Sequence, residues 1–180
     1  MAASLEFPAI SIVLFGVQVH VSNPQQGAFR MWVIRIPPPV WTLLFIVLAF
    51  GIDRLYPWRE LVDVRSPLAA VLLAGLGIGV AVWARSLFVA ANTTLVPASP
   101  VNNALVVEGP YRFSRNPMYL ALVMIALGVA FYVGSTPMFL APVGVFLLCN
   151  GVFIPFEEAK MLRQFGETYA AYTHRVRRWI

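Results

Sequence analysis

The sequence predicts an all-α integral membrane protein: a polytopic helix bundle of about four spans with a C-terminal amphipathic helix. Of the 180 residues, 59% are hydrophobic and only 12% are charged, against about 45–50% and about 25% in soluble domains. The mean hydropathy of +0.76 excludes a disordered chain, which needs low hydrophobicity and high charge. Long apolar runs also alternate with short charged segments. A soluble enzyme is therefore disfavoured.

The net charge of +5 comes from 13 Lys and Arg against 8 Asp and Glu. In a soluble protein this excess would suggest nucleic acid, but in a membrane protein the preference of basic residues for cytoplasmic loops explains it more simply. We therefore expect no nucleic-acid partner. Cys149 is the single cysteine, and the two histidines lie far apart, so neither an intrachain disulfide nor a metal site is expected.

Prolines mark where the first two spans begin, because proline is tolerated at a helix start but not in a helix interior. The first span is predicted over residues 40–56, after the three prolines at 37–39. A charged loop follows over 53–65. Ser66 is then the expected N-cap of a second span over residues 67–91.

The second span carries Gly75, Gly77 and Gly79. Small residues let a neighbouring membrane helix approach closely, so the set is predicted to form a helix contact. A polar loop over residues 92–116 follows, and loops of that length in compact proteins are usually functional or disordered.

The third span is predicted over residues 117–134, with Asn116 as its N-cap. The fourth is predicted over residues 137–156, and only a tight hairpin fits between the two. Beyond it, apolar residues recur at spacings of three and four, which predicts an amphipathic helix on the membrane or over the bundle. These residues are Leu162, Phe165, Tyr169, Tyr172, Val176 and Trp179.

Residues 1–34 are predicted to be an N-terminal extension without a clear structural pattern, preceding a membrane domain over 35–180. Its apolar run at 9–21 is short for a span and fits an interfacial or re-entrant segment better. A fifth span would arise only if residues 5–21 crossed the membrane.

The distribution of positive charge predicts the orientation. With four spans, ten of the 13 Lys and Arg fall on the side of the 92–116 loop and the C-terminal tail, and three fall on the other side. The loop and the tail are therefore predicted to be cytoplasmic. The arginines at 175, 177 and 178 are predicted to bind lipid headgroups.

Two features on that side are not explained by spanning a bilayer: the segment 103–119 and the acidic pair 157–158. The start of the third span would present free backbone N–H groups and the positive end of a helix dipole. Both suit a carboxylate or a phosphate.

The side chains nearby extend this chemistry. Arg115 adds a cation, Glu157 or Glu158 could hold an ammonium group, and Tyr111 and Tyr119 could flank a planar base or a cation. A ligand with a carboxylate, an ammonium, an adenine and a sulfonium would use all of these groups. That ligand is S-adenosylmethionine.

These residues resemble the signature of the isoprenylcysteine carboxyl methyltransferases, which phospholipid methyltransferases and many bacterial relatives share. The first motif is Gly109-Pro110-Tyr111 followed by Arg115-Asn116-Pro117-Met118-Tyr119. The second is Glu157-Glu158, Phe165-Gly166, Tyr169, Tyr172 and Arg175. The resemblance covers about residues 35–180 and includes the Arg-x-Pro-Pro-Pro entry to the first span.

The resemblance implies an integral membrane methyltransferase of a bacterial inner membrane or an equivalent membrane, which binds S-adenosylmethionine from the cytoplasm. It implies cofactor contacts at ten positions: Asn103, Ala104, Leu105, Val106, Tyr111, Asn116, Pro117, Met118, Tyr119 and Glu157. Glu158 is expected to be structural, because adjacent helix residues point about 100° apart.

Three positions depart from the family pattern. Asn103 begins a segment that starts with histidine in the family, and Asn116 replaces the commoner histidine while keeping the capping role. Phe153 stands where the prenylcysteine enzymes have an arginine that orients the substrate carboxylate. Arg85, near the cytoplasmic end of the second span, is the expected substitute. Arg85 and Phe153 are thus the candidate substrate-binding residues, and Arg85 and Arg115 the candidate catalytic ones.

The expected activity is methyl transfer to a lipid-like or prenylated acceptor, with O-methylation of a carboxylate favoured. The acceptor tail would enter sideways between helices, under a lid formed by residues 92–116 and 157–175. Three alternatives stay open: a phospholipid amine N-methyltransferase, an NADPH-dependent membrane reductase of the same superfamily, and a non-enzymatic membrane scaffold.

Overall fold

The computed structural model describes residues 12–14, 17–19, 32–55, 63–91 and 104–180. The chain divides into two compact units, residues 1–33 and 34–180. In the first unit, β1 (Ile12–Leu14) and β2 (Val17–Val19) pair antiparallel, with Ile12 opposite Val19. Where it is described, the apolar run at 9–21 therefore forms strands and not a helical span. The other residues of that run lie outside the described residues.

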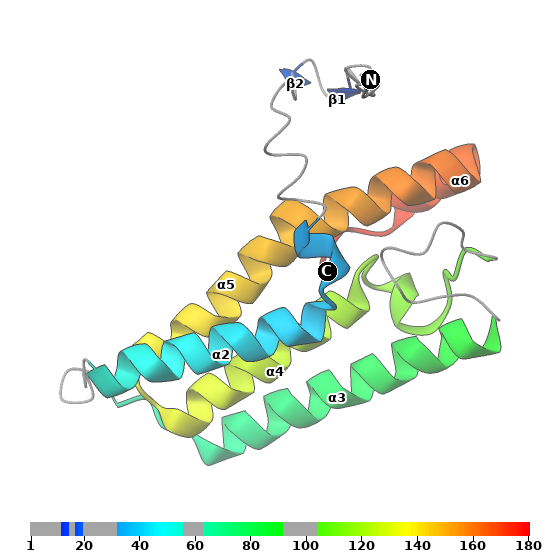
Figure 1. The fold of residues 1–180 in the computed structure, drawn as a ribbon. Coiled ribbons are helices and arrows are strands. Elements are labelled where there is room, and N and C mark those ends of the chain that lie inside the picture. Colours follow the sequence, from blue (N-terminus) through cyan, green and yellow to red (C-terminus); the bar gives the residue numbers. More distant parts are fainter. Residues whose placement is uncertain (1–11, 15–16, 20–31, 56–62, 92–103) are drawn as a thin grey trace. The chain divides into compact units, whose positions relative to one another are not determined.

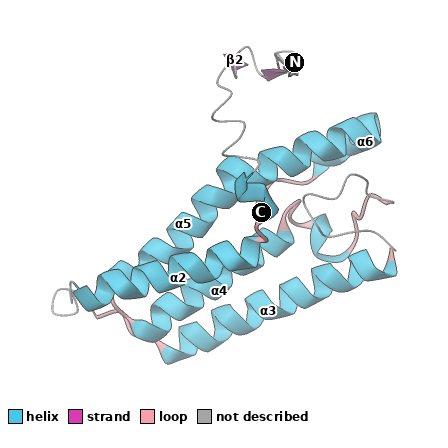
Figure 2. Ribbon diagram, viewed as in Figure 1, coloured by secondary structure: helices cyan, strands magenta, loops and turns pink. Residues whose placement is uncertain are grey.

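In the described part of the second unit the regular secondary structure is helical, with loops between the helices (Figures 1 and 2). Its helices are α2 (Pro38–Leu55), α3 (Pro67–Ala90), α4 (Pro117–Val133) and a continuous helical run over Thr136–Arg175. By length and composition, α2, α3 and the last run can cross a membrane, and α4 is a shorter apolar helix. This confirms the predicted all-α membrane bundle.

The helix boundaries follow the local signals in the sequence. The Ser66 hydroxyl accepts a hydrogen bond from the Ala69 backbone N–H at 3.3 Å, so Ser66 is the N-cap of α3 as predicted. Helix α4 ends at Gly134, whose φ of +83° is left-handed and whose N–H donates to the Ala130 carbonyl. A side chain at Gly134 would strain this conformation and collide with the Arg65 backbone.

The last helical run differs from the prediction. A 3₁₀ turn (Thr136–Phe139), α5 (Leu140–Leu148), a π-helical segment (Cys149–Phe153) and α6 (Ile154–Arg175) follow one another directly. Within α6, Gly166 has non-helical dihedral angles (φ 51°, ψ −125°), so the helix is kinked there. Pro155 directly follows the π-helical segment, so its missing N–H falls where the helical hydrogen-bond pattern is already irregular. Figure 1 shows the helix changing direction at the π segment, which is a recognised cause of helix bending.

The amphipathic helix is also shorter than predicted. Helix α6 ends at Arg175, and Val176 has extended backbone with φ −122° and ψ 131°. Val176 and Trp179 therefore lie beyond the helix, in a C-terminal segment that runs back along α6 in Figure 1. The spacing of three and four residues continued past the point where the helix stops, so periodicity alone misplaced the end.

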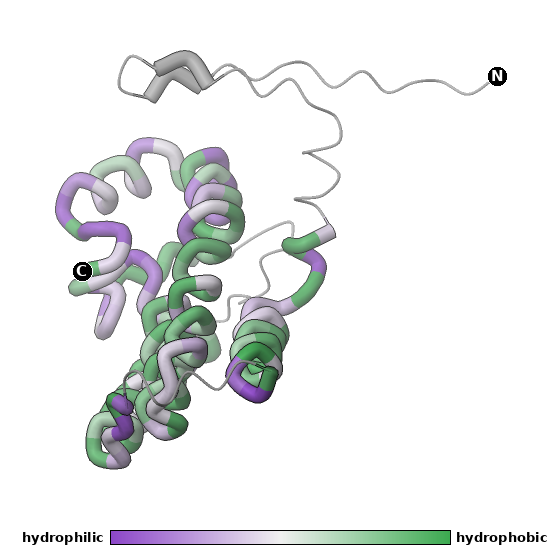
Figure 3. The backbone as a smooth tube through the Cα atoms, turned by 90° about the vertical axis from the view of Figure 1, so that its left-hand side faces the viewer, coloured by the Kyte–Doolittle hydropathy of each residue, from purple (hydrophilic) through white to green (hydrophobic). Residues whose placement is uncertain are grey.

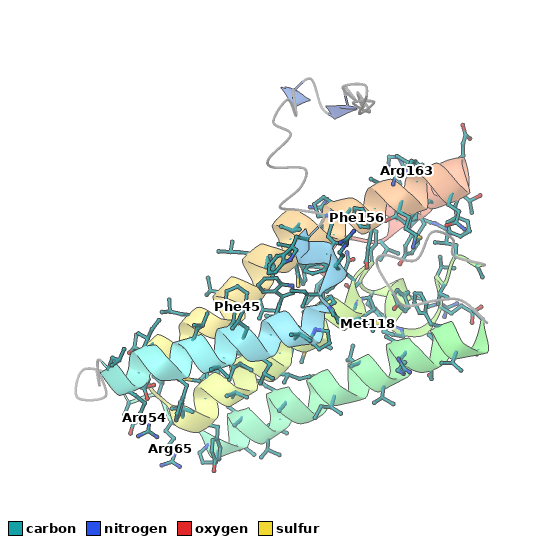
Figure 4. The ribbon with its side chains drawn as sticks, in the orientation of Figure 1. Phe45, Arg54, Arg65, Met118, Phe156 and Arg163 are labelled. Carbon is teal, nitrogen blue, oxygen red and sulfur yellow. The ribbon has the colours of Figure 1, made fainter. Side chains whose placement is uncertain are left out.

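Helix α4 packs against α3, α5 and α2, and α2 packs against α5. Ala49, Ala130, Met138 and Ala141 form a buried cluster, with Phe45 of α2 packed against it (Figure 4). Many large apolar side chains on the outer helix faces are exposed. The bundle helices are accordingly coloured mainly hydrophobic in Figure 3, whereas the part of the chain near the C-terminus carries more hydrophilic residues. Apolar outer surfaces are expected where helices face lipid tails.

The contact between α3 and α4 depends on two glycines. A Cβ on Gly77 would lie 2.9 Å from the Ala121 carbonyl oxygen, and a Cβ on Gly128 would lie 2.9 Å from that of Ala70. Gly75 and Gly79 have open space around them. The prediction that all three glycines of α3 form a helix contact is therefore wrong for two of them, because residues two apart lie about 200° apart around a helix.

Replacing Gly77 with valine should separate α3 from α4. We expect Gly77→Val to lower the free energy of unfolding by about 1–3 kcal/mol, the usual cost of overpacking. The thermal unfolding midpoint in detergent measures the effect. Gly79→Val adds the same side chain on the same helix and should leave the midpoint nearly unchanged. Equal losses in the two variants would contradict the close packing at Gly77.

Candidate functional site

A cavity of about 410 Å³ lies within the second unit, between the start of α2, the last turns of α3, the start of α4 and α6. Segment 104–119 forms one of its walls, and Met118 marks the start of α4 in Figure 4. Arg54 and Arg65 lie at the opposite end of the bundle in that view. The cavity is therefore at the end of the bundle that was predicted to carry most of the positive charge.

The structure brings most of the predicted site residues together. Eleven of the thirteen line this cavity: Arg85, Ala104, Leu105, Val106, Tyr111, Arg115, Asn116, Pro117, Met118, Tyr119 and Glu157. Asn103 lies outside the described residues. Phe153 is fully buried and does not line the cavity. Its ring lies behind that of Tyr119, with the two centroids 6.0 Å apart, so its placement gives it no contact with the cavity.

A hydrogen bond joins the two sequence motifs across the cavity wall. The Tyr119 hydroxyl donates to Glu157 Oε1 at 2.8 Å. Tyr119 is 6% exposed, so the bond forms in a largely desolvated setting, where a charge-assisted hydrogen bond is strong. The second carboxylate oxygen of Glu157 has further acceptor capacity, so a cationic group in the cavity could bind there.

Arg115 pairs with Glu158 on α6. Its Nη2 lies 3.1 Å from Oε1 of Glu158. The Glu158 carboxylate also accepts two hydrogen bonds from Arg178, one at each oxygen. Glu158 is thus held by two arginines, and it also lines the cavity. The guanidinium of Arg178, one of the tail arginines predicted to bind lipid headgroups, is engaged with Glu158 while its side chain stays 38% exposed.

Asn116 occupies the N-cap position of α4 but does not cap the helix with its side chain. Its Nδ2 donates instead to the carbonyl of Arg178 at 3.0 Å, and its backbone N–H donates to the Ser114 hydroxyl. The predicted capping role is therefore wrong. Because the N–H groups of a first helical turn have no acceptor within the helix, the start of α4 can serve an anion in the cavity.

Tyr111 is held at the cavity wall from two sides. The Tyr172 hydroxyl donates to the Tyr111 carbonyl at 2.7 Å, and the ring of Phe88 lies 5.5 Å from that of Tyr111 between centroids. Burial, with a smaller contribution from Glu157, raises the pKa of Tyr111. Its hydroxyl is therefore neutral, and its ring offers an apolar face to a flat ligand.

Sequence reasoning missed several residues of the cavity. Lys160, 9% exposed, lies on α6 three residues after Glu157 and therefore on the same helix face. That spacing was the available signal. Arg35 and the prolines at 37–39 line the opposite wall. They belong to the Arg-x-Pro-Pro-Pro motif, which the sequence analysis identified as the start of the first span and as part of the family resemblance, without assigning these residues to the site.

Comparison with known proteins identifies the family. The family model described as phospholipid methyltransferase matches residues 66–168, a range that includes the first motif, the second motif as far as Phe165-Gly166, and most of the cavity wall. The chain therefore belongs to the phospholipid methyltransferase family, whose members are membrane methyltransferases. This confirms the resemblance that the motifs indicated.

The comparisons go no further than the family. The chain is 33% identical over 63 residues to a Haemophilus influenzae protein described as "Uncharacterized protein". The match covers 35% of this chain and all of that protein. No solved structure matches the chain.

The bond between Tyr172 and Tyr111 should support the cavity wall. Tyr172→Phe removes the donor and leaves the Tyr111 carbonyl buried without a partner, which costs about 1–3 kcal/mol. We expect the thermal unfolding midpoint to fall accordingly. Tyr132→Phe removes the same hydroxyl from an exposed position on α4 and should have little effect. A fall of similar size in both variants would contradict a specific role for the buried bond.

Proposed function

We propose that this membrane methyltransferase uses S-adenosylmethionine and transfers its methyl group to the carboxylate of a lipid-like acceptor. One observation carries the proposal. A single cavity, within the residues that the family model matches, combines the Tyr119–Glu157 pair, Arg115, the first turn of α4 and Arg85. These groups supply the charges that such a cofactor and such an acceptor need.

The residues at one end of the cavity fit the proposed cofactor. The partly buried Glu157 suits the α-ammonium group or the sulfonium. Arg115 and the first turn of α4 suit the carboxylate, and the ring of Tyr111 suits the adenine. When bound, S-adenosylmethionine supplies a methyl group that is already activated for transfer.

The acceptor end is lined by arginines. Arg85 of α3 and Arg35 before α2 both line the cavity, and either can pair with a carboxylate. Because position 153 is phenylalanine and not arginine, our proposal assigns the pairing with the acceptor carboxylate to Arg85. The apolar part of the acceptor would contact Leu122 and the prolines at 37–39, which also line the cavity.

An anionic acceptor requires little acid–base chemistry from the enzyme. A carboxylate is already deprotonated at neutral pH, so the chain need not supply a general base. Its residues instead orient the acceptor through Arg85, balance its charge and exclude water from the cavity. An amine acceptor would have to lose a proton before or during transfer, which requires a base. This difference supports the carboxylate.

The distribution of charged residues supports an orientation of the protein in the membrane. The excess of Lys and Arg at the cavity end favours a cytoplasmic position for that end, where a water-soluble cofactor is available. We propose a bacterial inner membrane or an equivalent membrane as the location. The acceptor would reach the cavity from the bilayer, as a lipid-like or prenylated molecule.

Cofactor binding tests the first half of the proposal. Purified full-length protein in detergent should bind S-adenosylhomocysteine in titration calorimetry. Glu157→Gln and Tyr119→Phe should each weaken binding about tenfold or more, as expected for a lost hydrogen bond to a charged group. Glu167→Gln, an exposed position on the same helix, is the matched control.

Two results would contradict this half of the proposal. Quenching of tryptophan fluorescence by NADPH without any response to S-adenosylhomocysteine would favour the reductase. No binding of either compound by the wild-type protein would favour a scaffold.

Transfer of a labelled methyl group tests the acceptor. We expect label in a prenylated cysteine derivative with a free carboxyl group, and release of that label as methanol on base treatment, because an ester is base-labile. Arg85→Gln should raise the acceptor KM about tenfold, the scale of a lost partner of a charge pair, and leave the cofactor KM unchanged. Arg163→Gln on the exposed part of α6 is the control.

The acceptor assay has an outcome that would overturn the carboxylate. Base-stable label in phosphatidylethanolamine, with none in the carboxylate acceptor, would identify a phospholipid amine N-methyltransferase. Unchanged kinetics in Arg85→Gln would remove Arg85 from the acceptor site.

A further inference from the structure

The last five residues form a strap across the start of α4. After α6 ends at Arg175, the chain turns back, and Val176 is extended. The Arg177 carbonyl accepts a hydrogen bond from the Arg115 backbone N–H at 3.0 Å. The Arg178 carbonyl accepts bonds from the side chains of Ser114 and Asn116. Residues 176–180 therefore bind the segment from which Arg115 and Asn116 reach the cavity.

The far end of the strap is anchored on the π-helical segment between α5 and α6. Trp179 Nε1 donates to Asn150 Oδ1 at 3.1 Å, and its ring packs 4.8 Å from that of Phe146 between centroids. Asn150 lies in the π segment. A π segment in an α-helix is frequently associated with a functional site, and here it presents an amide that holds the strap in place.

Arg178 links the strap to the charge of the cavity. Its Nε and Nη2 bind both oxygens of Glu158, at 3.2 and 2.5 Å, and Arg115 Nη2 shares Oε1 at 3.1 Å. The side chain of Arg115 is only 14% exposed and that of Glu158 only 18%. Arg178 is more exposed, at 38%, but the Glu158 carboxylate that it binds is poorly screened by solvent, so the charge on that carboxylate matters for a ligand nearby. Two arginines on one glutamate leave one net positive charge.

We infer that Arg178 is a positioning residue that keeps Arg115 electrostatically available to an anionic group in the cavity. Without Arg178, Glu158 would neutralise Arg115 alone, and the strap would lose its ionic anchor beside the cavity. Arg178 does not line the cavity, so it acts through Glu158 and Arg115. The inference rests on the proposed function, in which that anionic group is the carboxylate of the cofactor's amino-acid part.

Two ligands separate an electrostatic role from a structural one. S-adenosylhomocysteine carries the carboxylate, and 5′-methylthioadenosine lacks the whole amino-acid part. With full-length protein in detergent, we expect Arg178→Gln to raise the Kd for S-adenosylhomocysteine about tenfold and to change the Kd for methylthioadenosine less than about twofold. Arg163→Gln loses the same charge from an exposed position on α6, outside the strap, and should change neither Kd.

Two further variants isolate the charge. Arg178→Lys keeps the positive charge and should recover most of the affinity for S-adenosylhomocysteine. In the double variant Glu158→Gln with Arg178→Gln, Arg115 has no carboxylate to neutralise it. This variant should therefore bind S-adenosylhomocysteine more tightly than Arg178→Gln alone. Unfolding midpoints of all variants show whether the fold is retained.

Three results would overturn the inference while leaving the proposed function standing. The first is wild-type affinity in Arg178→Gln. The second is an equal loss for both ligands, which would indicate a structural role. The third is a double variant no better than Arg178→Gln. A wild-type protein that binds neither ligand would overturn the proposed function, and the role of Arg178 with it.

Discussion

Two adjacent glutamates on α6 bind the two ends of the motif from Arg115 to Tyr119, and the cavity depends on these contacts. Glu157 accepts a hydrogen bond from Tyr119, and Glu158 pairs with Arg115. Because neighbouring residues on a helix point about 100° apart, the pair can reach two different partners from one turn. The contacts bring the start of α4 against the start of α6 and close the cavity between segments almost forty residues apart. These contacts pair polar groups where water is scarce, although the Nε of Arg115 is buried without a hydrogen-bond partner.

The remainder of the bundle places the other cavity walls around this junction. The close approach of α3 and α4 at Gly77 and Gly128 carries the last turns of α3, with Arg85 and Phe88, to the same end. The π segment redirects the last helix so that α6 lies over the cavity and does not simply continue α5. The apolar outer surfaces and the polar site are thus compatible, because the site lies at one end of the helices and the apolar surfaces lie along the rest of their length.

The elements that the sequence predicted well are those set by local chemistry. Ser66 and Gly134 mark helix ends through backbone geometry that neighbouring residues decide. The apolar runs predicted the spans because lipid admits few alternatives to a helix. The predictions failed where the answer depended on distant partners. The side chain of Asn116 was a plausible cap, but the Arg178 carbonyl offered a better partner. Val176 and Trp179 continued a helical spacing and yet left the helix for contacts with Asn150 and the start of α4.

By itself the sequence determined the class of fold, the end of the bundle that carries the site, and the family. Composition, proline positions and the two motifs indicate these because they do not depend on how the helices pack. Tertiary structure alone decided which glutamate binds which partner, that Lys160 and Arg35 line the cavity, and that Phe153 does not. These outcomes depend on the direction in which each side chain points once the helices are packed. That direction is set by the bend at the π segment and by the strap, which no short-range pattern encodes.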